Sequence, residues 1–263
     1  MAELDKMFFE AFNFLDKLMK TTFQLFKKPR VVLIIPARNE EKNIAKVIKA
    51  GKKSEYVTDI LVVDSFSVDN TANVAKESGV SVIRQYHKKG GKGGAIYTGI
   101  KEANGEIFVV MDADIENISQ KIIDKLIKPI IKENLDYVIG NFKLERGRVT
   151  RFTALPLLKL FFPEVKFKQP LSGLFAARSS ILKKLEIKEG WGVEISLTLD
   201  MVMNGYKSKE VYLGEIKHAE NPLKLKTQQA QEIAKTLIQK AHEYKRIKIK
   251  MDALKLIESK HTK

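Results

Sequence analysis

With 263 residues, 44% of them hydrophobic, the chain can bury a sizeable core, and its lack of cysteine excludes disulfides, thiolate catalysis and thiolate metal ligands. Its formal net charge of +15 indicates anionic partners, whether nucleic acid, acidic lipid or phosphorylated small molecules. No apolar run approaches the roughly 20 residues that a membrane-spanning helix needs, and Glu3 and Asp5 make the amino terminus unlike a secretory signal, so we expect a cytoplasmic protein.

Residues 1–30 are expected to form an amphipathic helical extension. Apolar side chains recur at helical spacing from Leu4 to Phe26, extra aromatic residues widen the stripe, and lysines lie beside it. Such a helix packs on the catalytic domain or on a second subunit, or it lies on an anionic membrane surface as a peripheral contact at the inner membrane face. The sequence leaves these options open.

Strands and helices alternate through residues 31–145, the expected nucleotide-sugar half of a catalytic domain. The predicted strands are 31–35, 60–63, 80–83, 107–111 and 137–140, and the predicted helices are 40–50, 71–77, 93–103 and 122–131. Unbroken Val and Ile runs indicate strands buried on both faces, and the alternation predicts an α/β fold with a mostly parallel nucleotide-binding sheet flanked by helices. In such sheets the ligand lies beyond the carboxyl ends of the strands.

The regular alternation of strands and helices does not continue in residues 146–222. We expect these residues to build the acceptor half of the same catalytic domain, 31–222. Here the predictions are helices near 152–162 and over 193–203 and a strand over 208–213. Residues 223–263 form a basic helical extension with apolar residues at near-heptad spacing. That extension pairs with a second subunit, which makes a homodimer, or packs on its own domain.

The triplet Asp112-Ala113-Asp114 directly follows the predicted strand 107–111. Such a triplet is most often a turn or a helix cap. Here it leaves a buried strand at its carboxyl end, so both carboxylates can face a divalent cation whose coordination sphere a diphosphate completes. The cation would neutralise the charge that develops on a departing diphosphate.

Two other strand ends are candidates for nucleotide contacts. The first strand ends in Ile35-Pro36-Ala37-Arg38-Asn39-Glu40, where Pro36 should stop the ladder and the loop can wrap a base and ribose. The second ends in Asp64-Ser65, which can hydrogen-bond a ribose or base. Ordinary strand-to-helix turns would also explain both segments.

The segment Gly90-Gly91-Lys92-Gly93-Gly94 opens a predicted helix. Glycines let backbone amides approach a phosphate closely, the helix start adds partial positive charge, and Lys92 can reach the same anion. The Gly-Lys-Ser/Thr ending of a P-loop is missing, so an ATPase is excluded.

These three features, in this order, resemble the A-type glycosyltransferases over residues 31–145. Motifs further along the chain narrow the resemblance to the glucosyl-3-phosphoglycerate synthase family. They are Gly147-Arg148-Val149-Thr150, Leu155-Pro156-Leu157-Leu158, Phe162-Pro163-Glu164, Gln169-Pro170-Leu171-Ser172-Gly173, Gly190-Trp191-Gly192-Val193-Glu194-Ile195, and His218 with Asn221-Pro222-Leu223.

The resemblance implies a retaining enzyme that moves glucose or a related hexose from a nucleotide diphosphate sugar to 3-phosphoglycerate or a similar small anionic acceptor, with Mg²⁺ or Mn²⁺ as cofactor. It implies that the metal is bound by Asp114 and His218, with Asp112 supporting the donor. Because both carboxylates of the triplet can face the cation, the expected metal site is Asp112, Asp114 and His218. The implied catalytic residues are Asp114, Glu194 and Lys92. The implied nucleotide-sugar contacts are Pro36, Ala37, Arg38, Glu40, Ser65, Lys92, Asp112 and Ala113, and the implied acceptor contacts are Gly147, Arg148, Val149, Thr150 and Glu220.

Some positions depart from the family pattern. Ile216 and Glu220 stand where the family has Arg and Asn, and Leu174-Phe175 replaces a Glu-Tyr pair. Without the arginine the grip on the diphosphate weakens, and Glu220 would repel an anionic acceptor unless it faces away. These departures bear on the acceptor and on the nucleotide rather than on the reaction type.

Two other functions fit part of the sequence. A membrane-surface glycosyltransferase would use a polyprenyl phosphate acceptor, with residues 1–30 as the dock. A non-enzymatic nucleic-acid-binding protein would use the Lys-rich tail, but this leaves the ordered acidic motifs unexplained, so we expect no nucleic-acid partner.

Overall fold

The computed structural model describes residues 12–15, 28–86, 90–143, 147–218 and 222–249. Strands and helices alternate as the sequence predicts, and two segments named η are a π-helix (η2) and a 3-10 helix (η3). The elements in chain order are β1 (Val31–Ala37), α2 (Ile44–Lys52), β2 (Asp59–Asp64), α3 (Thr71–Glu77), β3 (Ser81–Arg84), α4 (Gly91–Glu102), β4 (Ile107–Val110), α5 (Gln120–Lys132), β5 (Tyr137–Phe142), η2 (Thr150–Ala154), α6 (Leu155–Phe161), β6 (Phe175–Arg178), α7 (Ser179–Leu182), η3 (Gly190–Gly192), α8 (Val193–Met203), β7 (Ser208–Gly214) and α9 (Leu223–Glu243).

The strands form a seven-stranded sheet in the order β3-β2-β1-β4-β6-β5-β7. β1 pairs in parallel with β2 and β4, β2 with β3, and β5 with β7. β6 runs antiparallel between β4 and β5. The predicted mostly parallel sheet is therefore confirmed, while the direction of β6 is new, because pairing direction depends on residues that are distant in the chain.

The strand order reverses between β1 and β4. After β1 the chain builds β2 and β3 on one side, and it then returns to place β4 on the other side of β1. In open α/β sheets the crevice at such a switch point, beyond the carboxyl ends of the strands, is where ligands bind. The segments that follow β1 and β4 therefore border the expected ligand site.

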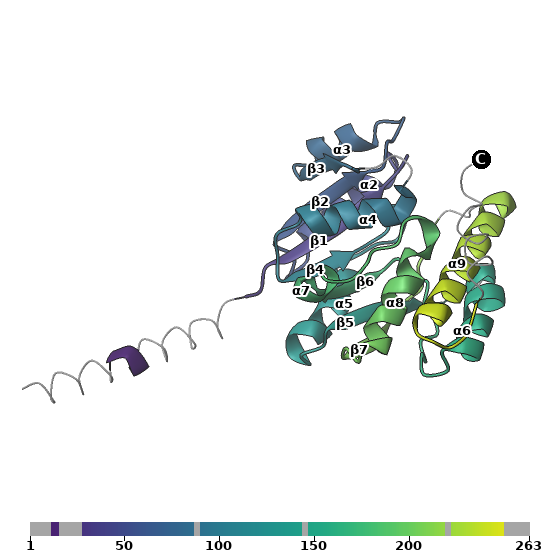
Figure 1. The fold of residues 1–263 in the computed structure, drawn as a ribbon. Helices are drawn as coiled ribbons and strands as arrows, with labels where there is room; N and C mark the ends of the chain where they lie inside the picture. Colours follow the sequence, from purple (N-terminus) through teal and green to yellow (C-terminus); the bar gives the residue numbers. More distant parts are fainter. Residues whose placement is uncertain (1–11, 16–27, 87–89, 144–146, 219–221, 250–263) are drawn as a thin grey trace, which may run out of the picture.

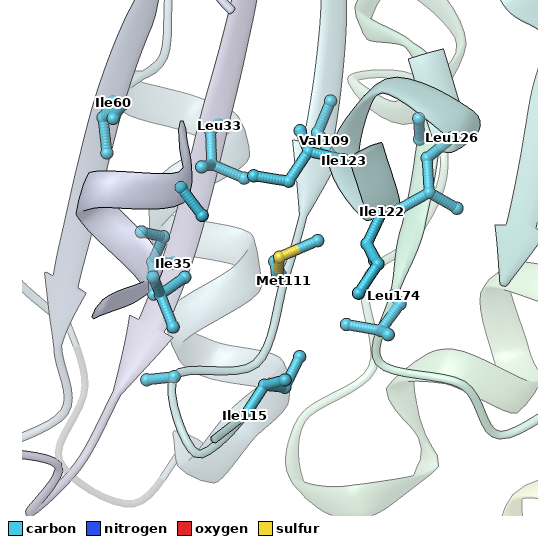
Figure 2. Packing of buried hydrophobic residues seen from close by; sticks show 14 of the residues in the cluster. Leu33, Ile35, Ile60, Val109, Met111, Ile115, Ile122, Ile123, Leu126 and Leu174 are labelled. Carbon is cyan, nitrogen blue, oxygen red and sulfur yellow. The ribbon is translucent and has the colours of Figure 1, made fainter. Parts of the chain in front are cut away.

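Helices cover both faces of the sheet, so its central strands are buried on both sides. On one face Leu33 and Ile35 of β1 and Val109 of β4 pack in a cluster with Ile123 and Leu126 of α5, as Figure 2 shows. Alternate residues of the same strands point to the other face, which α4 and α8 cover in front of the sheet in Figure 1. Burial of both faces accounts for the continuous Val and Ile runs.

A third apolar cluster joins the C-terminal helix α9 to α6 and α8. Its buried members include Leu158 of α6, Phe162 directly after it, Leu199 of α8, and Leu237 and Ala241 of α9. Figure 1 shows α9 beside α6 at one end of the sheet. Within the described residues, the apolar side of the basic tail is covered by its own domain.

Four helices differ from the prediction at their starts, and two of them, α4 and α5, simply begin two residues earlier, at Gly91 and Gln120. The helix expected at residue 40 begins at Ile44, because the backbone N–H groups of Asn43 and Ile44 both donate to the carbonyl of Glu40 in a preceding turn. The helix expected near 152–162 begins two residues earlier as the π-helix η2 and continues as α6. Pattern alone does not separate π-helix from α-helix, since both place side chains at similar spacing.

The prediction that Pro36 stops the ladder was wrong, because β1 continues through Pro36 to Ala37. Pairing between β1 and β4 ends at Ile34, so the missing N–H of Pro36 costs that ladder no hydrogen bond. Pairing with β2 continues to Ala37. The strand therefore places Ala37 at the carboxyl end of the sheet, beside Asp64 of β2.

Much of the predicted amino-terminal helix lies outside the described residues. Residues 12–15 are helical, and the side chains of Phe12, Phe14 and Leu15 are exposed. None of the helices in the described part of the chain is long and apolar enough to cross a membrane.

Candidate active site

The acidic triplet lies at the switch point, directly beyond β4. The backbone N–H of Met111 donates to the carbonyl of Ile34 (3.2 Å), which ties the end of β4 to β1 just before the triplet. Ala113 is buried, whereas Asp112 and Asp114 on either side of it are half-buried. The turn thus anchors its middle residue in the core and leaves both carboxylates partly exposed beyond the end of β4.

Gly173 leaves the room that Asp112 occupies. A Cβ atom at Gly173 would lie only 2.1 Å from Oδ2 of Asp112. The loop before β6 therefore runs against the carboxylate, and a side chain there would require Asp112 to move. In the sequence this glycine stands out only as part of a family motif, without a role of its own.

A β-bridge brings the late histidine to the triplet. Ile115 and His218 form an antiparallel bridge, and the backbone N–H of Glu116 donates to the carbonyl of Lys217 at 2.8 Å. The side chain of Asn117 holds the same strip, accepting from the N–H of Lys217 at 2.8 Å. Residues about a hundred positions apart in the chain are thus fixed beside each other at the site.

Several carboxylates lie close enough to one another around the acidic triplet to shift each other's pKa. Burial raises the pKa of Asp114, the nearby Asp112 carboxylate raises it further, and the charges of Lys92 and His218 oppose the rise. Burial also raises the pKa of Glu40, against a hydrogen bond from Asn43, and the charges of Asp114 and Asp112 contribute to the rise. Carboxylates that raise one another's pKa in this way favour binding of a cation.

The donor set at this point suits Mg²⁺ or Mn²⁺. Asp114 offers carboxylate oxygen and His218 offers imidazole nitrogen, which both ions accept. Among the described residues, no three His, Asp or Glu side chains gather as a site that could hold an ion by themselves. An ion bound by Asp114 and His218 would therefore need further oxygen ligands from a substrate or from water.

Lys92 joins the two halves of the site. Its ammonium nitrogen lies 2.6 Å from Oδ1 of Asp112 and 2.6 Å from Oε1 of Glu194. Asp112 follows β4, and Glu194 lies in the first turn of α8. The cation therefore holds the acidic triplet and the start of α8 together.

Burial and the neighbouring charges shift the pKa of Lys92 in opposite directions. Burial alone lowers the pKa of Lys92, but the adjacent carboxylates of Asp112 and Glu194 outweigh it and raise the pKa above the ordinary lysine range. Burial raises the pKa of Glu194, Lys92 opposes that shift, and Asp112 adds to it. Lys92 is consequently a permanently charged group fixed inside the site.

The loops after β1 and β2 form one connected rim. Asn39, with φ of 58°, donates its N–H to Ser67 (3.0 Å) and accepts from the N–H of Val68 (2.9 Å). The N–H of Glu40 donates to Thr71 (2.8 Å), and that of Ser65 donates to Ala37 (2.8 Å). The predicted nucleotide contacts at this rim are thus brought together: Pro36, Ala37, Arg38, Glu40 and Ser65.

The glycines around Lys92 have a packing role that the phosphate interpretation missed. A Cβ atom at Gly93 would lie 2.0 Å from the carbonyl oxygen of Lys188. One at Gly91 would lie 3.3 Å from Cα of Gly190. The start of α4 is therefore in close backbone contact with the segment leading into α8, and this contact places Lys92 beside Glu194.

The predicted acceptor contacts lie at the start of η2. Arg148 is exposed, Val149 packs against the third cluster, and Thr150 is buried. The backbone N–H of Arg151 donates to the carbonyl of Gly147 at 2.9 Å. Glu220 lies outside the described residues.

Comparison with known proteins identifies the chain. The family model described as "Glycosyl transferase family 2" matches residues 32–185. The chain belongs to glycosyl transferase family 2. It is a glycosyltransferase with a mostly parallel seven-stranded sheet flanked by helices.

Two relatives illustrate where it lies within the family. The glucosyl-3-phosphoglycerate synthase of Petrotoga mobilis is 31% identical over 242 residues, covering 82% of this chain and 74% of the relative. The dolichol-phosphate mannosyltransferase of Pyrococcus furiosus is 31% identical over 200 residues, covering 69% of this chain and 54% of the relative. The predicted resemblance to glucosyl-3-phosphoglycerate synthases is confirmed.

Solved structures agree with this relationship. Glucosyl-3-phosphoglycerate synthase from Mycobacterium tuberculosis in complex with Mn²⁺, uridine diphosphate and glucosyl-3-phosphoglycerate matches with a TM-score of 0.78 at 30% identity, covering 81% of this chain and 80% of that one. The same enzyme with Mg²⁺ and uridine diphosphate matches with a TM-score of 0.76 at 29% identity, with the same coverage.

Three of the positions expected to depart from the family pattern are core positions. Leu174 and Ile216 are buried in the same apolar cluster as α5, and Phe175 is buried on the opposite face of the sheet. Ile216 therefore supplies no charge to the site. In the described part of the chain, the positive charge beside the acidic triplet comes from Lys92, which pairs with Asp112.

Proposed function

We propose that the chain transfers glucose from uridine diphosphate glucose to 3-phosphoglycerate, with retention of the anomeric configuration and with Mn²⁺ or Mg²⁺ as cofactor. The observation that carries the proposal is the joint placement of Asp114, His218, and the Lys92 pairs with Asp112 and Glu194 at the switch point. The relatives named above, with their ligands, support the choice of donor and acceptor.

Asp114 and His218 would hold the metal ion. When bound, the ion supplies Lewis-acid stabilisation of the negative charge on the diphosphate. Asp112 stays paired with Lys92 and faces the donor. The rim formed by Pro36, Ala37, Arg38, Glu40 and Ser65, with Ala113 beneath, would hold the base and ribose.

Lys92 would stabilise the leaving group directly. In the reaction the bond between the anomeric carbon and the diphosphate oxygen breaks, and a bond from that carbon to the acceptor hydroxyl oxygen forms on the same side, while the hydroxyl proton passes to the departing diphosphate. A fixed ammonium group near the departing oxygens stabilises the negative charge that develops on the diphosphate, and it does so without reorganisation. Glu194, within reach of Lys92, would orient the sugar by accepting hydrogen bonds from its hydroxyl groups.

The acceptor would bind where Gly147, Arg148, Val149 and Thr150 begin η2. Arg148 is exposed and offers a bidentate fork to a phosphate or carboxylate. Backbone N–H groups at a helical start favour the same anion. The net charge of +15 is in keeping with two anionic substrates.

A panel of acceptors tests this assignment. Purified protein, uridine diphosphate glucose and Mn²⁺ are incubated with 3-phosphoglycerate, glycerol 3-phosphate, or a polyprenyl phosphate in detergent, and released uridine diphosphate is measured. We expect kcat/KM to be highest with 3-phosphoglycerate. Release that depends only on the polyprenyl phosphate would refute the proposal.

Such a result would favour a second candidate function, glycosyl transfer to a polyprenyl phosphate. The specific observation behind this candidate is the 31% identity to a dolichol-phosphate mannosyltransferase. The same panel repeated with guanosine diphosphate mannose as donor separates the two.

A further inference from the structure

The helical segment that carries Glu194 is capped by a residue from another helix. Oε2 of Glu232, on α9, accepts a hydrogen bond from the backbone N–H of Trp191 at 2.8 Å. Trp191 lies in η3, which runs directly into α8. Within the described part of the chain, no side chain at the N-cap position of η3 or of α8 makes a capping hydrogen bond. Glu232 therefore supplies the negative charge and the acceptor that a helix start favours.

Close backbone packing fixes η3 against α9. Gly190 has φ of 70°, and a Cβ atom there would lie 2.5 Å from Oε2 of Glu232. A Cβ atom at Gly192 would lie 2.0 Å from Oγ1 of Thr236, one turn further along α9. Substituted residues at these positions would push η3 away from the capping carboxylate.

η3 also contacts the start of α4. Gly91 and Gly93 approach Gly190 and Lys188 closely, as described above, and Lys92 lies between these two glycines. Glu194 lies two residues after Gly192, in the first turn of α8, which directly follows η3. Hence η3 is packed between α9 and α4, and its position sets the distance between Lys92 and Glu194.

A buried ion pair joins α9 to α8. Nζ of Lys240 lies 2.7 Å from Oδ1 of Asp200, and these side chains are only 2% and 5% exposed. The hydroxyl of Tyr244 donates to the same carboxylate at 2.7 Å. Glu232 is thus held on a helix that is itself locked to α8.

We propose that Glu232 is a positioning residue that keeps Lys92 and Glu194 in their reactive arrangement by fixing η3. The inference rests on the proposed function for its kinetic consequence. Misplacement of reacting groups by about 1 Å costs up to about 100-fold in rate. Loss of the acceptor oxygen that Glu232 offers to the N–H of Trp191 should therefore lower kcat, whereas the Kd of uridine diphosphate, bound at the rim after β1 and β2, should stay unchanged.

The test compares Glu232→Ala, Glu232→Asp and Glu232→Gln with Glu243→Gln, which removes a half-exposed carboxylate from the same helix. We expect kcat to fall about 10- to 100-fold in Glu232→Ala and less in Glu232→Asp, whose shortened carboxylate reaches Trp191 poorly. Glu232→Gln keeps an acceptor oxygen and should restore most of kcat, and Glu243→Gln should match the wild type. If Glu232→Ala does not fold, the order Glu232→Asp below Glu232→Gln carries the test.

Trp191 provides a readout that does not depend on activity, because it is the one tryptophan of the chain. Its emission should shift in Glu232→Ala or Glu232→Asp and stay unchanged in Glu243→Gln. Unchanged emission together with kcat within two-fold of wild type would overturn the inference, as would a rise in the Kd of uridine diphosphate that equals the loss in kcat. If the wild type transfers no glucose at all, the proposed function fails, and the emission alone decides whether Glu232 fixes η3.

Discussion

The ammonium nitrogen of Lys92 lies 2.6 Å from Oε1 of Glu194, which joins the start of α4 to the start of α8. The acidic triplet shares this cation through Asp112. The positive charge is therefore fixed before any substrate binds, which is the preorganisation that favours stabilisation of a leaving group.

Replacing Lys92 by methionine should lower kcat about 100- to 1,000-fold, because one preorganised charge for the leaving group is lost. Steady-state release of uridine diphosphate measures this. Lys101→Met is the matched control, since Lys101 is an exposed lysine on the same helix and should leave kcat unchanged. Equal activity in the two variants would show that Lys92 takes no part in the reaction.

The pH dependence of kcat should report the buried carboxylate of Glu194. Burial raises its pKa, and although Lys92 opposes the shift the net change is upward from the ordinary value of 4.5. Protonation at low pH removes the negative charge beside Lys92, so we expect kcat to fall on acidification with a midpoint above 4.5. In Glu194→Gln the midpoint of the acidic limb should change, because only the other carboxylates of the site, such as Asp114, are left to titrate. A wild-type profile that stays flat down to pH 4.5 would contradict this assignment.

The sheet and its switch point follow from the sequence because buried parallel strands leave an unambiguous pattern. The runs at 31–35 and 107–111 predict two central strands, and the acidic triplet is predicted at the edge where the structure places it. The antiparallel strand β6 and the π-helix η2 were not predictable, since pairing direction and hydrogen-bond register depend on distant neighbours.

Replacing Gly173 by alanine should weaken binding of the donor and the metal. The added Cβ would lie 2.1 Å from Oδ2 of Asp112, so that carboxylate must move from its place beside Lys92. We expect the affinity for uridine diphosphate with Mn²⁺ to fall about 10- to 100-fold, as for other groups that orient a metal site. Isothermal titration calorimetry measures it.

Gly205→Ala is the control for backbone strain alone. Gly205 has φ of 73°, and no atom of the described residues lies within 4 Å of the place that a Cβ would take, so the substitution strains the backbone without a clash. It should lower the free energy of unfolding and leave the affinity for uridine diphosphate unchanged. If both glycine variants bind equally well, the contact between Gly173 and Asp112 has no role in donor binding.

The buried pair of Lys240 and Asp200 should matter for stability far more than a surface pair. Lys240→Met leaves the buried Asp200 carboxylate without its cation, which should cost about 3–5 kcal/mol of unfolding free energy. Lys209→Met removes a comparable contact to Glu133 at 2.7 Å, where both side chains are nearly half exposed, and should cost about 0–1 kcal/mol. Urea denaturation compares the two, and similar losses would contradict the account of how α9 is anchored.

The site was predictable where a single segment carries its chemistry and not where two segments meet. The triplet at 112–114 and Lys92 were selected from local sequence alone. The family resemblance added His218 and Glu194. No local pattern shows that Lys92 pairs with Glu194, or that Glu232 caps the segment before Glu194, because these contacts join residues far apart in the chain.

The most direct test of the proposed reaction measures both products in one mixture of the protein, uridine diphosphate glucose, 3-phosphoglycerate and Mn²⁺. Mass spectrometry quantifies glucosylated 3-phosphoglycerate. The same mixture is measured in parallel with EDTA, with Asp114→Ala and with Glu116→Gln. Glu116→Gln is the control, because Glu116 is an exposed carboxylate in the same loop. We predict equal amounts of product and uridine diphosphate, loss of both with EDTA or Asp114→Ala, and no change with Glu116→Gln. Product that persists undiminished in EDTA or in Asp114→Ala would contradict the account.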